Sequence, residues 1–172
     1  VSARDPSQRR LDAARTWREL ARRTGDVLAL RRAAQSAEKA AEGFKREGRA
    51  RGWAAARLEQ AEAAMLGADL YGDDGLNAAA ETALREVRKT APTAAVAAVA
   101  WGRLVRLEAR QVLASPDMKA VFAASAAFDT AILALEGHLR ARSIGKSEVA
   151  RLRCDRAEFL IGAGARLKAV HL

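Results

Sequence analysis

The chain has 172 residues, of which 50% are hydrophobic and 30% charged, and its formal net charge is +9. It contains 43 alanines and 19 leucines, while aromatic residues make up only 5%. Because alanine and leucine favour helices and strands favour β-branched and aromatic residues, this composition excludes a β-rich fold and predicts an all-α protein. The single cysteine, Cys154, excludes an internal disulfide. The sequence has no set of Cys and His residues with metal-ligand spacing, so no metal site is expected.

Capping residues, glycines and prolines divide the chain into seven expected helices. Asp5-Pro6 predicts the start of the first helix, and Ser115-Pro116 predicts the start of the sixth with Ser115 as its N-cap. The expected helices cover residues 6–24, 26–46, 51–71, 74–89, 93–114, 116–142 and 147 to the end. The short connections between them force neighbouring helices to run antiparallel. We therefore expect helical hairpins over 6–47, 51–90 and 93–142 and a capping helix over 147–170, in one domain spanning 1–172.

The hairpins carry residues at recurring positions. The first has Trp17, Leu20, Ala33 and Ala40, the second Tyr71, Ala80 and Leu84, and the third Ala124, Phe128 and Ala131. In this spacing they resemble the tetratricopeptide repeat (TPR), in which small residues let two helices approach and large ones fill the space beside them. The expected helices are longer than those of the ~34-residue standard repeat, as in divergent TPR-like arrays of bacterial proteins. The resemblance implies a short right-handed α-solenoid; the alternative is a closed helical bundle with accidental matches.

The resemblance also implies which residues contact a partner, because the first helix of each TPR pair lines a concave face. By register, the implied contacts are Arg15, Arg18 and Arg22 in the first pair, Glu62, Met65 and Asp69 in the second, and Arg106 with Ala109 and Leu113 in the third. Three arginines at this spacing share one helix face and are suited to binding carboxylates. The alternative reading is an ordinary solvated helix face.

These observations predict a non-catalytic scaffold or adaptor that binds a protein or peptide and needs no cofactor. One alternative is a basic protein that binds nucleic acid or an anionic surface; another is a helical bundle that carries a small ligand. The charge pattern weakens the nucleic-acid reading, because residues 58–84 contain six acidic residues and no basic one between two basic ends. Neither His138 nor His171 has a partner at metal-ligand spacing, and Cys154 is expected to be a small buried residue.

The sequence allows more than one location and more than one state of assembly. The sequence lacks an uncharged apolar run of transmembrane length, so no membrane-spanning segment is expected. The chain begins with Val1 rather than methionine, which leaves upstream processing or truncation, and a cytoplasmic or exported location, as alternatives. The chain is expected to be a monomer or a homodimer that pairs through its C-terminal helix.

Overall fold

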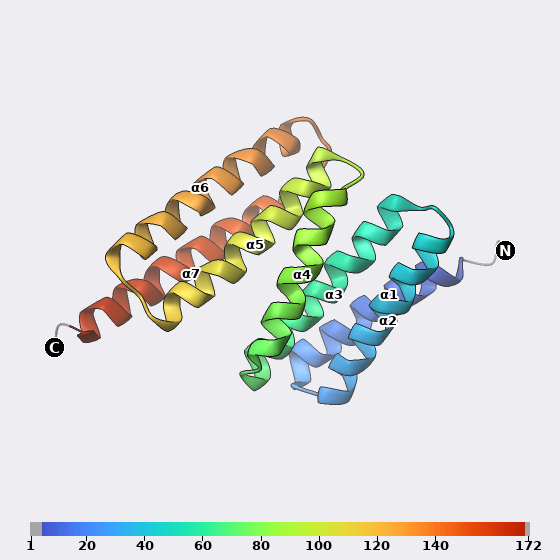
Figure 1. The fold of residues 1–172 in the computed structure, drawn as a ribbon, viewed down its shortest axis with the longest axis horizontal. Helices are drawn as coiled ribbons and strands as arrows, with labels where there is room; N and C mark the ends of the chain where they lie inside the picture. Colours follow the sequence, from blue (N-terminus) through green and yellow to red (C-terminus); the bar gives the residue numbers. More distant parts are fainter. Residues whose placement is uncertain (1–4, 171–172) are drawn as a thin grey trace. The chain divides into compact units, whose positions relative to one another are not determined.

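The computed structural model describes residues 5–170, with side chains as far as residue 168. Seven helices joined by short turns make up nearly all of this part of the chain, which contains no strand (Figure 1). They are α1 (Pro6–Thr24), α2 (Val27–Arg46), α3 (Ala50–Tyr71), α4 (Asp74–Thr90), α5 (Ala94–Ala114), α6 (Met118–Arg140) and α7 (Lys146–Val170). The predicted all-α fold is confirmed, and the helix bounds lie within a few residues of those expected.

Aspartates at the N-caps fix where several helices begin. The Asp26 carboxylate accepts a hydrogen bond from the backbone N–H of Leu28, which satisfies a donor that the first turn of α2 leaves unpaired. The expected start of the sixth helix at Ser115 was wrong. Asp117 is its N-cap, because the Asp117 carboxylate accepts the N–H of Ala120 at 2.9 Å.

The contacts along the chain divide it into two compact units between Pro92 and Thr93. Unit 1 contains α1 to α4 and unit 2 contains α5 to α7. Each unit has buried side chains of its own. The expectation of a single array that continues across residues 92–93 stays a prediction.

In unit 1 each helix packs against the next one in the chain, and α1 also contacts α3. Small residues make these contacts close: Ala21, Ala29, Ala33 and Ala63 are buried together, and Trp17 packs against their cluster. A second cluster surrounds the fully buried ring of Phe44. Ala33, Ala40, Ala80 and Leu84 are buried completely, whereas Leu20, expected to pack between helices, is 40% exposed.

Tyr71 links two turns of unit 1 that are far apart in the sequence. Its hydroxyl donates a hydrogen bond to the carbonyl of Gly25 at 2.9 Å. Gly25 and Gly72 end α1 and α3 with φ values of 68° and 67°, a left-handed conformation that glycine adopts without strain. The C-terminal end of α3 is thereby tied to the turn between α1 and α2.

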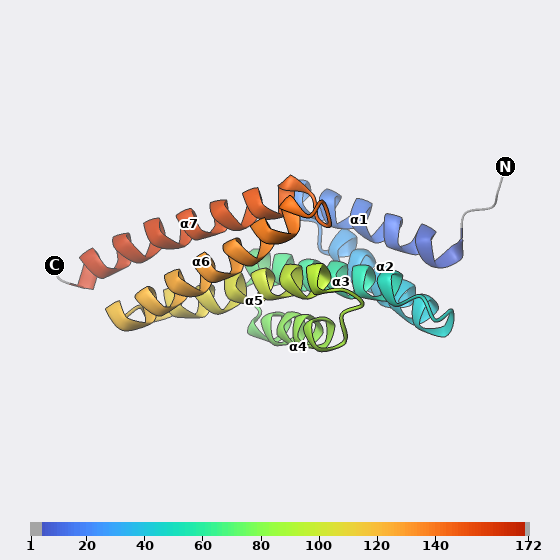
Figure 2. The same ribbon diagram turned by 90° about the horizontal axis from the view of Figure 1, so that it is seen from above.

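In unit 2 all three helices contact one another, so α7 packs on both α5 and α6 (Figure 2). Val149, Leu152 and Phe159 of α7 are buried in this packing. Phe128 and Ala131 of α6 are fully buried as well, while Ala124 is half-buried. The apolar stripe of α7 thus covers the apolar surface of the other two helices.

Candidate functional site

The three arginines predicted on α1 all have acidic partners. Arg15 lies 3.5 Å from the carboxylate of Asp12, and Arg22 donates two hydrogen bonds to Glu19, at 2.9 and 2.7 Å. Arg18 is different, because its guanidinium reaches from α1 to Glu59 on α3 and forms an ion pair there. The positive charge on this face of α1 is therefore partly neutralised by acidic residues of the same chain.

The Arg18 pair lies at the contact between α1 and α3 and is largely withdrawn from solvent. Burial by itself lowers the pKa of Arg18, but the hydrogen bond to Glu59 and the charges of Glu59 and Glu62 outweigh it and raise that pKa above its usual value. Glu59 and Glu62 are both buried. These residues hold the two helices together rather than present free charges to a partner.

The positions predicted on α3 are mostly inside the molecule. Glu62 and Met65 are buried, and only Asp69 is exposed. The placement of Met65 follows from the packing of α3, which has α2, α4 and α1 as neighbours and therefore little free surface. Unit 1 thus leaves Arg15, Arg22 and Asp69 as accessible members of the predicted set.

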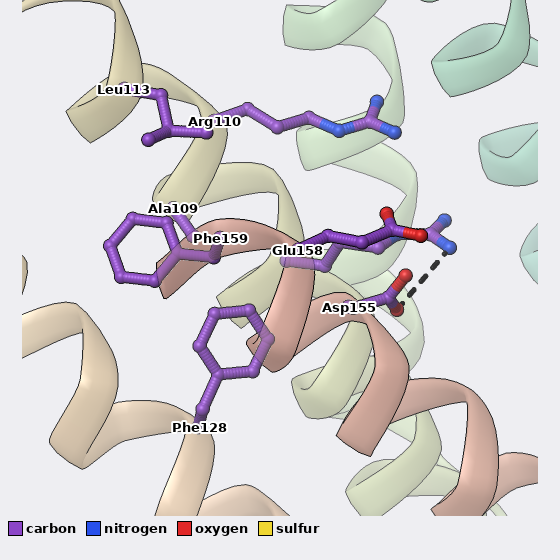
Figure 3. A pocket seen from close by; sticks show the side chains of 8 residues that line it. Ala109, Arg110, Leu113, Phe128, Asp155, Glu158 and Phe159 are labelled. Atoms are coloured by element: carbon purple, nitrogen blue, oxygen red, sulfur yellow. Dashed lines mark ion pairs between the residues drawn. The ribbon is translucent and has the colours of Figure 1, made fainter. Parts of the chain in front are cut away.

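In unit 2 the predicted residues come together. Arg106, Ala109 and Leu113 of α5 line one pocket of about 120 Å³ with Arg110, also of α5, and with residues of α6 and α7 (Figure 3). The remaining lining residues are Phe128, Asp155, Glu158 and Phe159. Four of the eight lining residues therefore lie along one face of α5, at the three- and four-residue spacing of a helix.

The pocket, which we call the α5–α7 pocket, has an apolar side and a charged side. The rings of Phe128 and Phe159 lie with their centroids 5.8 Å apart and form the apolar side. Figure 3 shows the guanidinium of Arg110 and the carboxylates of Asp155 and Glu158 pointing away from those rings. Arg106 is buried and forms an ion pair with Asp155 at 3.7 Å, which fixes both side chains at the pocket.

Both units join their first and third helices by arginine and acid pairs. Arg18 and Glu59 do so between α1 and α3, and Arg106 and Asp155 do so between α5 and α7. Arg103 and Glu148 form a further α5–α7 pair at 3.5 Å. The first helix supplies the cation each time, so the two units share a charge arrangement as well as a helix arrangement.

Sequence reasoning missed half of the pocket. Arg110 lies four residues after Arg106 and so shares its helix face, which the sequence could have revealed. Asp155 and Glu158 gave no such signal, because only the packing of α7 against α5 brings them to the pocket. Phe159 was not among the predicted contact residues. Cys154, expected to be buried, is exposed.

Two larger hollows lie in unit 1. One of about 500 Å³ is lined mainly by apolar residues of α2, α3 and α4, and one of about 350 Å³ lies beside Phe44 and Trp53. None of the predicted contact residues lines either hollow. Within residues 5–170 no three His, Cys, Asp or Glu side chains are grouped so that they could hold a metal ion, and His171 lies outside the described residues.

Comparison of the chain with protein-family models, curated proteins and solved structures gave no match. The functional interpretation therefore rests on the residues and their arrangement.

Proposed function

We propose that the protein is a non-catalytic scaffold that binds a protein or peptide through a TPR-like helical array. The observation that carries this proposal is the α5–α7 pocket. The alignment of the chain with the repeat predicts that Arg106, Ala109 and Leu113 contact a ligand. All three residues line this pocket. The contact of α1 with α3 and of α5 with α7 supports the array, because such an array stacks the first helices of successive pairs side by side.

The dimensions of the pocket favour a single side chain as its ligand. Pockets for cofactors and drug-sized molecules have volumes of ~300–1,000 Å³, whereas this one has about 120 Å³. Phe128 and Phe159 offer an apolar surface, and Arg110 offers a guanidinium suited to a carboxylate. A peptide with an apolar side chain next to an acidic group, or next to its own C-terminal carboxylate, would place the apolar side chain against the rings and the carboxylate at Arg110.

Selection from a displayed library of random peptides tests this proposal. We expect the selected peptides to share an apolar residue beside a carboxylate. By titration calorimetry their affinity for Arg110→Ala should fall about tenfold or more, since a hydrogen bond to a charged group contributes ~1.5–3 kcal/mol. Ala109→Leu should weaken binding as well, by filling the pocket.

Arg23→Ala is the matched control, because Arg23 is an exposed arginine of α1 that pairs only with Glu19 among the ion pairs described for it. Its peptide affinity should equal that of the wild type. Thermal unfolding of each variant separates lost binding from lost folding. A library that yields no binders, or binders that keep full affinity for Arg110→Ala and Ala109→Leu, would contradict the proposal.

A further inference from the structure

The outward face of α6 carries large apolar side chains that are exposed. Met118, Phe122 and Leu133 are 54%, 67% and 64% exposed, and Ala126 between them is exposed too. The most apolar 18 residues of this helix have a mean hydropathy of 1.5, yet only 28% of them are buried. By length and composition α6 could cross a membrane, but this is weak evidence and remains consistent with the predicted absence of a transmembrane segment. An exposed apolar face of this kind marks an interaction surface.

The residues along this face have the spacing of a coiled-coil seam. Lys119, Phe122, Ala126, Asp129, Leu133 and Glu136 follow one another at alternating steps of three and four residues. That spacing keeps one narrow stripe of a helix against a partner helix. We call these six residues the α6 seam. Its charges are a lysine near one end, a glutamate near the other and one aspartate in the middle.

We propose that α6 pairs with α6 of a second copy of this chain, antiparallel, about a two-fold axis that passes between residues 127 and 128. In this register Phe122 faces Leu133 of the second copy, and Lys119 faces Glu136 of the second copy. Two-fold symmetry repeats each contact, so the apolar pair and the ion pair both occur twice. A closed dimer of this kind covers the same face on both copies.

Charge complementarity selects this orientation. A parallel pair would place Lys119 beside Lys119 of the second copy and Glu136 beside Glu136 of the second copy, and both contacts are repulsive. The antiparallel pair brings opposite charges together. Glu136 already forms an ion pair with Arg153 through one carboxylate oxygen, and its second oxygen can accept Lys119 of the second copy.

Asp129 disfavours two other registers. Its carboxylate pairs with Arg156 of the same chain at 3.0 Å and is exposed. In the proposed register it faces Ala126 of the second copy, whose small side chain leaves the carboxylate in contact with water. A register in which residue 129 faced residue 122 of the second copy would press Asp129 against Phe122, and one in which it faced residue 133 would press it against Leu133. Either register also separates Lys119 from Glu136. The same three charges make the seam a poor fit for the interior of a bilayer.

Cysteine cross-linking tests the orientation and the register. In a Cys154→Ser background, the double variant Lys119→Cys with Glu136→Cys carries two thiols about 25 Å apart along one helix, too far for a disulfide within the chain. In the proposed dimer the thiol at position 119 of each copy faces the thiol at position 136 of the other copy. We expect a covalent dimer on a non-reducing gel after equilibration with reduced and oxidised glutathione. Either single-cysteine variant should stay monomeric on the gel, because its two thiols, one on each copy of the chain, lie about 25 Å apart in the dimer.

Light scattering and sedimentation test the dimer without cross-links. The wild type should have twice the 18.4 kDa mass of the chain, and Phe122→Asp should have the monomer mass with unchanged helicity, since Phe122 is exposed. Leu28→Asp is the matched control, because Leu28 is 62% exposed but lies on α2, and it should remain dimeric. A monomeric wild type, a dimer unaffected by Phe122→Asp, or a dimer in which the cysteine pair fails to cross-link would overturn the proposal. Binding of the monomer to phosphatidylcholine and phosphatidylglycerol vesicles through Phe122 would also overturn it, in favour of a membrane surface.

Discussion

Glu19 holds two arginines of α1 in place. Its carboxylate accepts hydrogen bonds from Arg22, three residues on, and from Arg23, four residues on. These bonds, first that of Arg22 and then that of Arg23, lower the pKa of Glu19 to about 2. The same contact raises the pKa of Arg22 above its usual value. A peptide carboxylate that binds Arg22 must therefore compete with Glu19.

The lowered pKa makes a prediction about acid. Because the carboxylate is favoured in the folded chain, Glu19 contributes stability above pH ~4.5, and this contribution is lost as the pH falls towards about 2. Glu19→Gln should therefore be less stable than the wild type in urea at neutral pH, and the difference should disappear in that acidic range. Salt should reduce the difference because the group is exposed. A carboxyl ¹³C titration of Glu19 with an ordinary midpoint would contradict this prediction.

Gly52 lies where α3 passes the ring of Phe44. A Cβ added at Gly52 would lie 2.5 Å from one ring carbon of Phe44 and 2.7 Å from two others, and that ring is fully buried. Glycine is normally unfavourable inside a helix, and the close approach of the ring accounts for it here.

We therefore expect Gly52→Ala to lower the free energy of unfolding by ~1–3 kcal/mol through overpacking. Gly164→Ala is the matched control, because Gly164 also lies inside a helix but has open space around its Cβ position. There the gain in helix propensity should raise the free energy of unfolding by ~0.5–1 kcal/mol. Urea titration measures both values, and equal effects of the two substitutions would show that Phe44 does not constrain Gly52.

At the scale of the helices, Asp73 and Asp74 have different roles although they are neighbours. Asp73 is the N-cap of α4 and accepts the N–H of Gly75 at 2.8 Å, whereas Asp74 is the first residue of the helix. Asp73→Ala should cost ~0.5–2 kcal/mol of stability, while Asp74→Ala should lose only a dipole interaction of ~0.3–1 kcal/mol. Thermal unfolding of the two variants compares them directly. A larger loss of stability for Asp74→Ala would contradict the assignment of Asp73 as the N-cap.

Most of the helices could be predicted from the sequence because their ends are marked locally. Asp26, Gly25 and Gly72 carry out the capping that their residue types suggest. The candidate site could be predicted only on α5, where register with the repeat gives Arg106, Ala109 and Leu113. Asp155 and Glu158 lie on another helix, and their approach depends on how α7 packs, which local spacing does not encode. Burial of Glu62 and Met65 likewise follows from the number of helices around α3.

At the scale of the whole chain, the net charge of +9 overstates the basic surface offered to a partner. Arginines of both units form ion pairs with acids, as Arg57 does with Glu86 and Arg156 with Asp129. We therefore expect only weak binding to duplex DNA, with a Kd no tighter than the ~10⁻⁴–10⁻⁶ M typical of non-specific contacts. Fluorescence anisotropy at low and moderate salt measures this. Nanomolar affinity that falls steeply with salt would favour the nucleic-acid alternative instead.

The most direct test of the proposed scaffold is a crystal structure of the protein with the tightest peptide from the library selection. It should show an apolar side chain of the peptide against Phe128 and Phe159 and a carboxylate of the peptide bound by Arg110. A peptide seated in the 500 Å³ hollow of unit 1, or anywhere that leaves the α5–α7 pocket empty, would contradict the proposed binding site.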